Sequence, residues 1–68
     1  MKNFIRVERA KLDLTQAELA EKLHVTRQTI NSIELGKFVP STVLSLKIAA
    51  FFKVKFEDLF MLEEKDWE

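Results

Sequence analysis

The segment from Leu14 to Gly36 constrains the fold of this chain more than any other feature, because it holds two short helix signatures in succession. It reads LTQAELAEKLHVTRQTINSIELG. Thr15 is followed three residues later by Glu18, which is the pattern of a capping box at the start of a helix. The first signature therefore predicts a helix over Gln16 to Leu23.

A brief turn at His24 and Val25 leads to the second signature. Thr26 is a favoured N-cap residue, and Gly36 stands where a left-handed C-terminal stop is expected. These marks predict a second helix over Arg27 to Leu35. Its first turn is rich in hydrogen-bonding side chains, an arrangement that suits a helix lying in the major groove of DNA.

The rest of the chain also has apolar residues at helical spacing. No segment alternates with period two, and the single Gly and single Pro fall between the periodic segments. The sequence therefore predicts an all-α domain over residues 1–62, followed by a charged C-terminal tail, 63–68, that is expected to fray. The further helices are expected at Lys2 to Leu12, after Ser41 as N-cap to Phe52, and at Phe56 to Phe60.

Each expected helix has an inward face. The residues assigned to these faces are Ile5, Arg9 and Leu12; Leu19, Ala20 and Leu23; Ile30 and Ile33; Leu44, Ile48, Ala49 and Phe52; and Phe56, Leu59 and Phe60.

Composition excludes several classes of protein. A chain of 68 residues without cysteine and with one histidine holds neither a disulfide framework nor a metal site. No apolar run is long enough for a signal peptide or a membrane span, so a cytoplasmic location without membrane contact is expected. No nucleophile or carboxylate pair has a catalytic spacing, so we expect no enzyme, no cofactor and no small-molecule ligand.

The distribution of charge is more informative than its sum. The chain has 11 basic and 11 acidic residues. Residues 1–37 carry seven Lys or Arg against five acids, whereas residues 38–68 carry four Lys against six acids. This mild asymmetry is compatible with nucleic-acid binding by the first half of the chain.

The motifs LTQ-ELA, V-RQTI and IE-GK, followed by P-S and KIA-FF-V--EDLF, identify a family resemblance. At these spacings the chain resembles the Cro/C1-type (XRE) helix-turn-helix family, and in particular its small stand-alone members. The similarity covers about Lys2 to Phe60. It implies a compact five-helix bundle of the lambda-repressor-like DNA-binding type, in which the second and third helices form the DNA-binding unit.

The resemblance also implies which side chains face double-stranded DNA. These are Gln16, Thr26, Arg27, Gln28, Thr29, Asn31, Ser32 and Lys37. Arg27, Gln28 and Ser32 match positions that face base edges, where Gln can pair with adenine and Arg with guanine. Thr26, Thr29 and Asn31 match contacts at the groove rim or to phosphate. Gln16, at a helix N-terminus, and Lys37 match phosphate contacts.

One matched pair has a structural role. Arg9 and Glu34 correspond to a partly buried ion pair that ties the first helix to the end of the third. Such a pair would orient the recognition helix.

The chain departs from the family pattern at four positions. His24 and Asp13 replace residues that are usually Gly, and His24 is expected to have a positive φ. Leu35 replaces a polar residue near phosphate, and Lys55 replaces a Ser or Thr cap. These changes bear on affinity more than on fold.

A further group of apolar residues lies largely off the core stripes. It comprises Val43, Leu46, Ala50, Phe51, Phe60, Met61 and Leu62, with Trp67 as an additional candidate. Large apolar patches on small proteins usually mark a partner, so this group predicts a homodimer interface. The alternative is that these residues only cover the edges of a small core.

Together these features predict a sequence-specific DNA-binding transcriptional regulator, a repressor that acts as a homodimer on an inverted-repeat operator. The recognition helix would be 27–35. The alternative is an antitoxin-like or adaptor module that uses the same fold to bind another protein.

Overall fold

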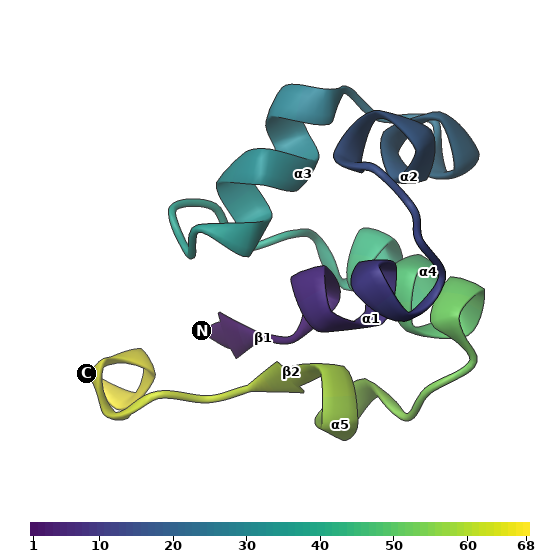
Figure 1. The fold of residues 1–68 in the computed structure, drawn as a ribbon. Coiled ribbons are helices and arrows are strands. Elements are labelled where there is room, and N and C mark those ends of the chain that lie inside the picture. The colour runs from purple at the N-terminus through teal and green to yellow at the C-terminus, as the bar shows by residue number, and fades with distance from the viewer.

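Five short helices make up most of the structure, a computed structural model that describes residues 1–68 (Figure 1). The helices are α1 (Ile5–Lys11), α2 (Gln16–Leu23), α3 (Arg27–Glu34), α4 (Thr42–Phe52) and α5 (Phe56–Leu59). Two short strands, β1 (Lys2–Asn3) and β2 (Phe60–Met61), and a 3-10 helix, η1 (Glu64–Trp67), complete the chain. The predicted five-helix architecture is therefore present, and the strands are an addition to it.

One apolar core holds the helices together. Its buried members are Ile5, Leu19, Ala20, Leu23, Ile30, Ile33, Ile48, Ala49, Phe52, Leu59 and Phe60. All of them were expected from helical spacing. The prediction was wrong for two further residues that were expected in the core, because Leu12 is 57% exposed and Phe56 is 37% exposed. Leu12 is the C-cap residue of α1 and so lies beyond the helical positions to which the inward spacing applies.

Hydroxyl side chains start three of the helices as the sequence predicts. Thr15 accepts a hydrogen bond from the Glu18 N–H, and the Glu18 carboxylate accepts one from the Thr15 N–H, which completes the capping box. The hydroxyl groups of Thr26 and Ser41 likewise accept from the N–H groups of Thr29 and Leu44 at the starts of α3 and α4, without the reciprocal bond. By contrast, α5 has no side-chain cap, as expected from Lys55.

Left-handed backbone conformations separate several elements. His24 ends α2 with φ 58°, and Gly36 follows α3 with φ 75°. Both were expected. Asp13 and Lys53 also have positive φ, at 54° and 58°. These three non-glycine residues carry local strain, because a side chain disfavours this region.

The two strands were not predicted. β1 and β2 pair antiparallel, with Lys2 opposite Met61 and Asn3 opposite Phe60. The expected helical start at Lys2 is therefore wrong, and α5 ends one residue earlier than expected. Strands of two residues are too short to show alternation, and their pairing joins opposite ends of the chain (Figure 1).

The expected fraying of the tail is also wrong. Residues of η1 form a short 3-10 helix, and the Met1 ammonium group lies 3.2 Å from both Glu63 Oε1 and Asp66 Oδ1. Its hydrogen bond to Glu63 raises the pKa of the ammonium group, and the hydrogen bond from the Glu63 backbone N–H lowers the pKa of Asp66. The tail is thus joined to the start of the chain.

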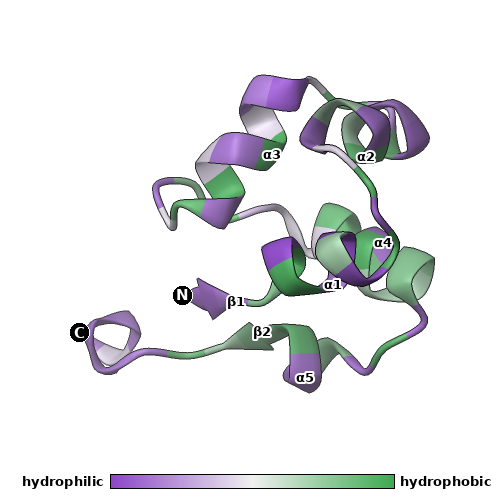
Figure 2. Ribbon diagram, viewed as in Figure 1, coloured by the Kyte–Doolittle hydropathy of each residue, from purple (hydrophilic) through white to green (hydrophobic).

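Hydropathy is distributed differently along α3 and α4. In Figure 2, α3 alternates between polar and apolar sides, whereas α4 is apolar along most of its length. None of the helices combines the length and the apolar character that crossing a bilayer requires.

Candidate nucleic-acid interface

The helices α2 and α3 form one packed unit joined by a three-residue turn. His24 in its left-handed conformation lets the Val25 N–H donate to the Ala20 carbonyl at 3.0 Å, which closes the end of α2. Leu19 and Leu23 of α2 and Ile30 of α3 are buried in the same cluster. This is the helix-turn-helix arrangement, with α3 as the outer helix.

The polar face of α3 points away from the core. Arg27, Gln28 and Asn31 are exposed, and Ser32 is half-buried beside them. Because Gln28 and Ser32 are one helical turn apart, they lie on the same face. The structure thus brings the expected base-reading residues onto one surface.

The first turn of α3 is closed by two threonines. Thr26 Oγ1 accepts the Thr29 N–H at 3.1 Å and lies 2.9 Å from the Thr29 hydroxyl. Both hydroxyl groups therefore have partners within the protein.

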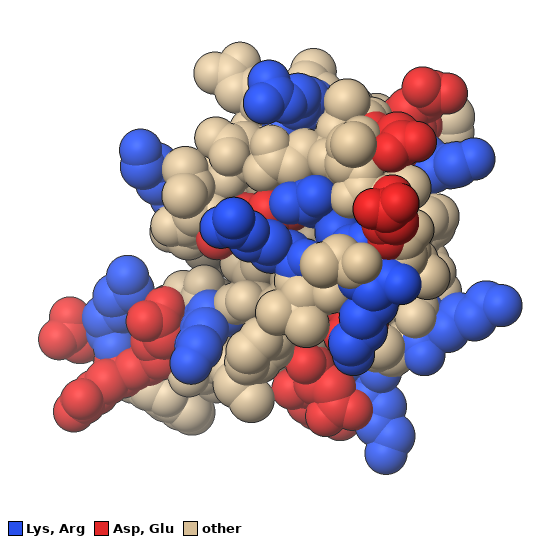
Figure 3. Space-filling view, in the orientation of Figure 1, with Lys and Arg blue, Asp and Glu red and all other residues tan.

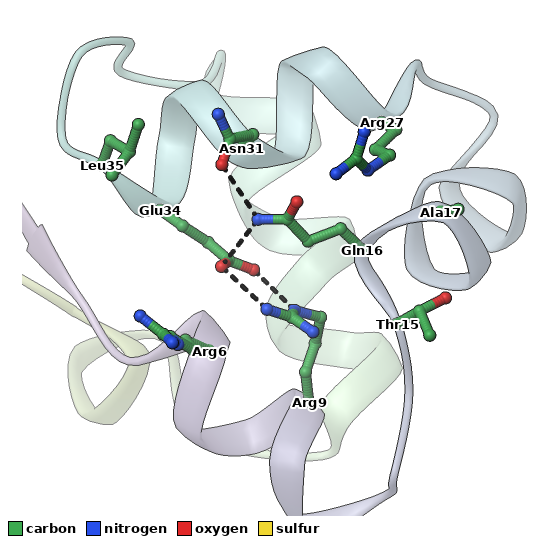
Figure 4. A pocket seen from close by; sticks show the side chains of 9 residues that line it. All are labelled: Arg6, Arg9, Thr15, Gln16, Ala17, Arg27, Asn31, Glu34 and Leu35. Atoms are coloured by element: carbon green, nitrogen blue, oxygen red, sulfur yellow. Dashed lines mark hydrogen bonds and ion pairs between the residues drawn. The ribbon is translucent and has the colours of Figure 1, made fainter.

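A hydrogen-bonded chain of four side chains links α1, α2 and α3 (Figure 4). Arg9 Nε donates to Glu34 Oε2 at 2.7 Å, and Arg9 Nη2 donates to Glu34 Oε1 at 3.0 Å. Gln16 Nε2 donates to Glu34 Oε1 at 3.1 Å and to Asn31 Oδ1 at 3.2 Å. The expected Arg9–Glu34 ion pair is formed, and Gln16 extends it to the exposed face of α3.

The ion pair is well shielded from water. The exposed fractions of the side chains are 14% for Arg9 and 6% for Glu34. The hydrogen bonds to Glu34 raise the pKa of the Arg9 guanidinium group above its ordinary value. Arg9 Nη1 also donates to the Leu14 carbonyl at 2.9 Å, so the same guanidinium group fixes the connection between α1 and α2.

This network borders an open hollow of about 490 Å³ between α1, the start of α2 and α3 (Figure 4). The residues that line it are Arg6, Arg9, Thr15, Gln16, Ala17, Arg27, Asn31, Glu34 and Leu35. Three arginines and one carboxylate leave the hollow with an excess of positive charge. Arg6 was missed by the sequence reasoning, because an exposed arginine on α1 has no local mark of a binding role.

The start of α2 adds hydrogen-bond donors to this hollow. The backbone N–H groups of Gln16 and Ala17 lie in the first turn, before any intrahelical acceptor is in reach. Such groups attract anions. The hollow therefore has the charge and the donors to hold a phosphate group.

Basic and acidic side chains are interspersed on this face of the molecule. In Figure 3, Lys and Arg side chains cross the middle over α1, and acidic side chains lie at the lower left, at the bottom and at the upper right, mostly beside basic ones. Lys37 is exposed just beyond α3, and Leu35, at the edge of the hollow, is 60% exposed without a polar group to offer.

Most of the apolar residues expected at a dimer interface are on the surface. Val43 is 68% exposed, Leu46 53% and Leu62 62%, and Met61 and Ala50 are also exposed. Phe60 is not available, because it is only 4% exposed and packs in the core opposite β1. Phe51 is half-buried against the core.

The helix-turn-helix class that this geometry defines is also found by comparison with known proteins. A family model described as "Helix-turn-helix" matches residues 5–59. The chain is 53% identical to an uncharacterized HTH-type transcriptional regulator of Methanocaldococcus jannaschii, over 97% of this chain and 100% of that protein. It is 47% identical to the uncharacterized HTH-type transcriptional regulator YgzD of Bacillus subtilis, with the same coverage.

A third relative, an uncharacterized HTH-type transcriptional regulator of Archaeoglobus fulgidus, is 45% identical over 100% of this chain and 97% of that protein. The chain belongs to the Cro/C1-type (XRE) helix-turn-helix family.

Proposed function

We propose that this protein is a transcriptional regulator that binds double-stranded DNA in a sequence-specific manner and acts as a repressor. The observation that carries the proposal is the position of the polar face of α3 beside the arginine-lined hollow at the start of α2. One surface then offers side chains for base edges and donors for phosphate. The relatives named as HTH-type transcriptional regulators support the same role.

In this proposal α3 lies in the major groove. Arg27, Gln28 and Ser32 read base edges, and Thr26, Thr29 and Asn31 lie at the groove rim. Gln16 and Lys37 contact phosphates on either side. The Gln16 amide is already bonded to Glu34 and Asn31, so its backbone N–H is the donor best placed for phosphate.

We further propose that the protein binds as a homodimer on an inverted repeat. The exposed apolar residues of α4 (Val43, Leu46 and Ala50) and of β2 and its end (Met61 and Leu62) would form the interface. A twofold axis would place two recognition helices about 34 Å apart, one turn of DNA. A bound dimer would then exclude other proteins from the duplex, which is the simplest form of repression.

Local contacts, not a general basic field, must supply the affinity, because the net charge is zero. If a dimer neutralises about six phosphates, the slope of log affinity against log salt concentration would be near −5. A slope near zero would contradict DNA binding.

The test is a selection of bound duplexes from a random pool by the purified protein. We expect a short motif with twofold symmetry. The Gln28→Ala variant should lose discrimination at one position in each half-site, with an unchanged melting temperature because Gln28 is exposed. Recovery of no motif, together with loss of function on changing Leu46, would favour the protein-binding alternative.

A further inference from the structure

A second hollow lies beside α3, distinct in lining and chemistry from the arginine-lined one. Its volume is about 250 Å³, and its exposed wall is mostly apolar. The residues that line it are Thr26, Gln28, Thr29, Ser32 and Phe38. Gln28 and Ser32 are proposed base-reading residues, so the hollow opens on the surface that would face the bases.

Phe38 is held beside α3 by the backbone. Gly36 reverses the chain with φ 75°, and the N–H groups of Lys37 and Phe38 both donate to the Ser32 carbonyl, at 3.0 and 3.3 Å. Phe38 also borders a small apolar gap that Ile33 and Phe60 line. The ring is therefore anchored, although 47% of the residue remains exposed.

The chemistry of this hollow does not suit a phosphate. It contains no charged side chain, and the hydroxyl groups of Thr26 and Thr29 are bonded to each other. The threonine methyl groups and the phenyl ring form the apolar part of the lining, beside the Gln28 amide and the Ser32 hydroxyl, which the proposed function assigns to base edges. In the major groove, the apolar group that a base presents is the C5 methyl of thymine.

We infer that this hollow receives the C5 methyl group of a thymine, with Phe38 as a specificity-determining residue. The inference rests on the proposed function, since it requires α3 in the major groove. Phe38 would contact the methyl group while Gln28 bonds to a base edge beside it. The protein would thus distinguish thymine from cytosine at one operator position partly through a residue outside the recognition helix.

The test removes only the methyl group. Once an operator has been selected, each thymine of a half-site is replaced in turn by deoxyuridine, and the affinity of the unaltered protein is measured. We expect one position at which binding weakens about fourfold per half-site, the effect of one buried methyl group. An operator that binds well but tolerates uracil at every thymine would overturn the inference and leave the proposed function intact.

Two variants assign the effect to its residue. Phe38→Ala should bind the thymine and uracil duplexes equally, at about the level of the parent protein on uracil. Val39→Ala is the matched control, because Val39 is an exposed apolar neighbour that does not line this hollow, and it should keep the full preference for thymine. If Phe38→Ala keeps that preference, Phe38 does not contact the methyl group. Failure to select any operator would instead contradict the proposed function.

Discussion

The side-chain amide of Asn3 donates a hydrogen bond to the backbone carbonyl of Ile33 at 2.8 Å, which joins β1 to the last turn of α3. The same side chain accepts the Ile5 N–H at 3.2 Å and so caps α1, whose own N-cap residue, Phe4, provides no side-chain cap. One asparagine thus satisfies backbone groups at the ends of two helices.

Replacing Asn3 by Ala should lower the free energy of unfolding by about 1–3 kcal/mol, because the Ile5 N–H would lose its side-chain acceptor and the Ile33 carbonyl would keep only the Gly36 N–H. Chemical denaturation measures the change. Lys2→Ala in the same strand is the control, since Lys2 is exposed, and it should fall within about 0.5 kcal/mol of the parent. Equal stabilities of the two variants would refute this role.

Replacing Arg9 by Ala should cost about 3 kcal/mol of stability, because Glu34 would keep its burial and lose its charged partner. Adding Glu34→Ala to this variant should recover part of the loss. Arg6→Ala is the control on the same helix, because Arg6 is exposed, and it should change stability by no more than about 0.5 kcal/mol. Simple additivity of the Arg9 and Glu34 changes would argue against a coupled pair.

The capping box of α2 should make stability depend on pH. The hydrogen bond from the Thr15 backbone N–H lowers the pKa of Glu18 from its ordinary value of 4.5. Because the folded-state pKa is the lower one, the contribution is fully present above the unfolded-state pKa and is lost as the pH falls through the folded-state pKa. Denaturation measured between neutral pH and pH 3 should show this loss.

The variant Glu18→Gln should remove that part of the pH dependence, since an amide oxygen can still accept the Thr15 N–H but does not titrate. Glu21→Gln, on the same helix and outside the capping box, is the control. An identical pH profile for the parent and Glu18→Gln would rule out this contribution.

His24→Gly should stabilise the protein by about 0.5–1 kcal/mol. The free energy gained by relieving the left-handed backbone strain should exceed the free energy lost to the greater conformational entropy of the unfolded chain. Lys53→Gly should behave in the same way, since Lys53 ends α4 with the same φ. Thermal melting of both variants measures the gain. A loss of stability in both would mean that their side chains contribute more than the backbone strain costs.

The proposed homodimer should be broken by Leu46→Asp, because a charge at the centre of an apolar interface is costly to bury. Sedimentation analysis should give a monomer with an unchanged fold, and operator affinity should fall. Val7→Asp is the control, since Val7 is a half-exposed apolar residue of α1 outside the proposed interface. A dimer that survives Leu46→Asp would exclude this α4 surface.

Local signals in the sequence predict most of the fold. The capping residues Thr15, Thr26 and Ser41 mark helix starts because each acts on backbone groups within three residues. Long-range features were missed for the opposite reason. The pairing of Asn3 with Phe60 depends on residues at opposite ends of the chain, and nothing near either residue indicates it.

In the candidate site, too, the local features could be predicted and the long-range ones could not. Its position on α2 and α3 could be predicted, and so could the ion pair between Arg9 and Glu34. The extension of this pair through Gln16, and the positions of Arg6 and Phe38 beside α3, arise from packing between elements. Only the apolar Phe38, two residues after the helix stop at Gly36, was a signal that could have been read.

The β1–β2 ladder also bears on the order in which we expect the molecule to assemble and open. Its pairing closes a loop of nearly the whole chain, and the entropic cost of that closure favours pairing after the helices have packed. We expect the ladder to form last and to open first, with the fastest amide hydrogen exchange among the paired segments. Because Asn3 lies in that ladder and bonds to Ile33, the C-terminal end of α3 would be released in the same opening event, while its first turn remains packed against α2.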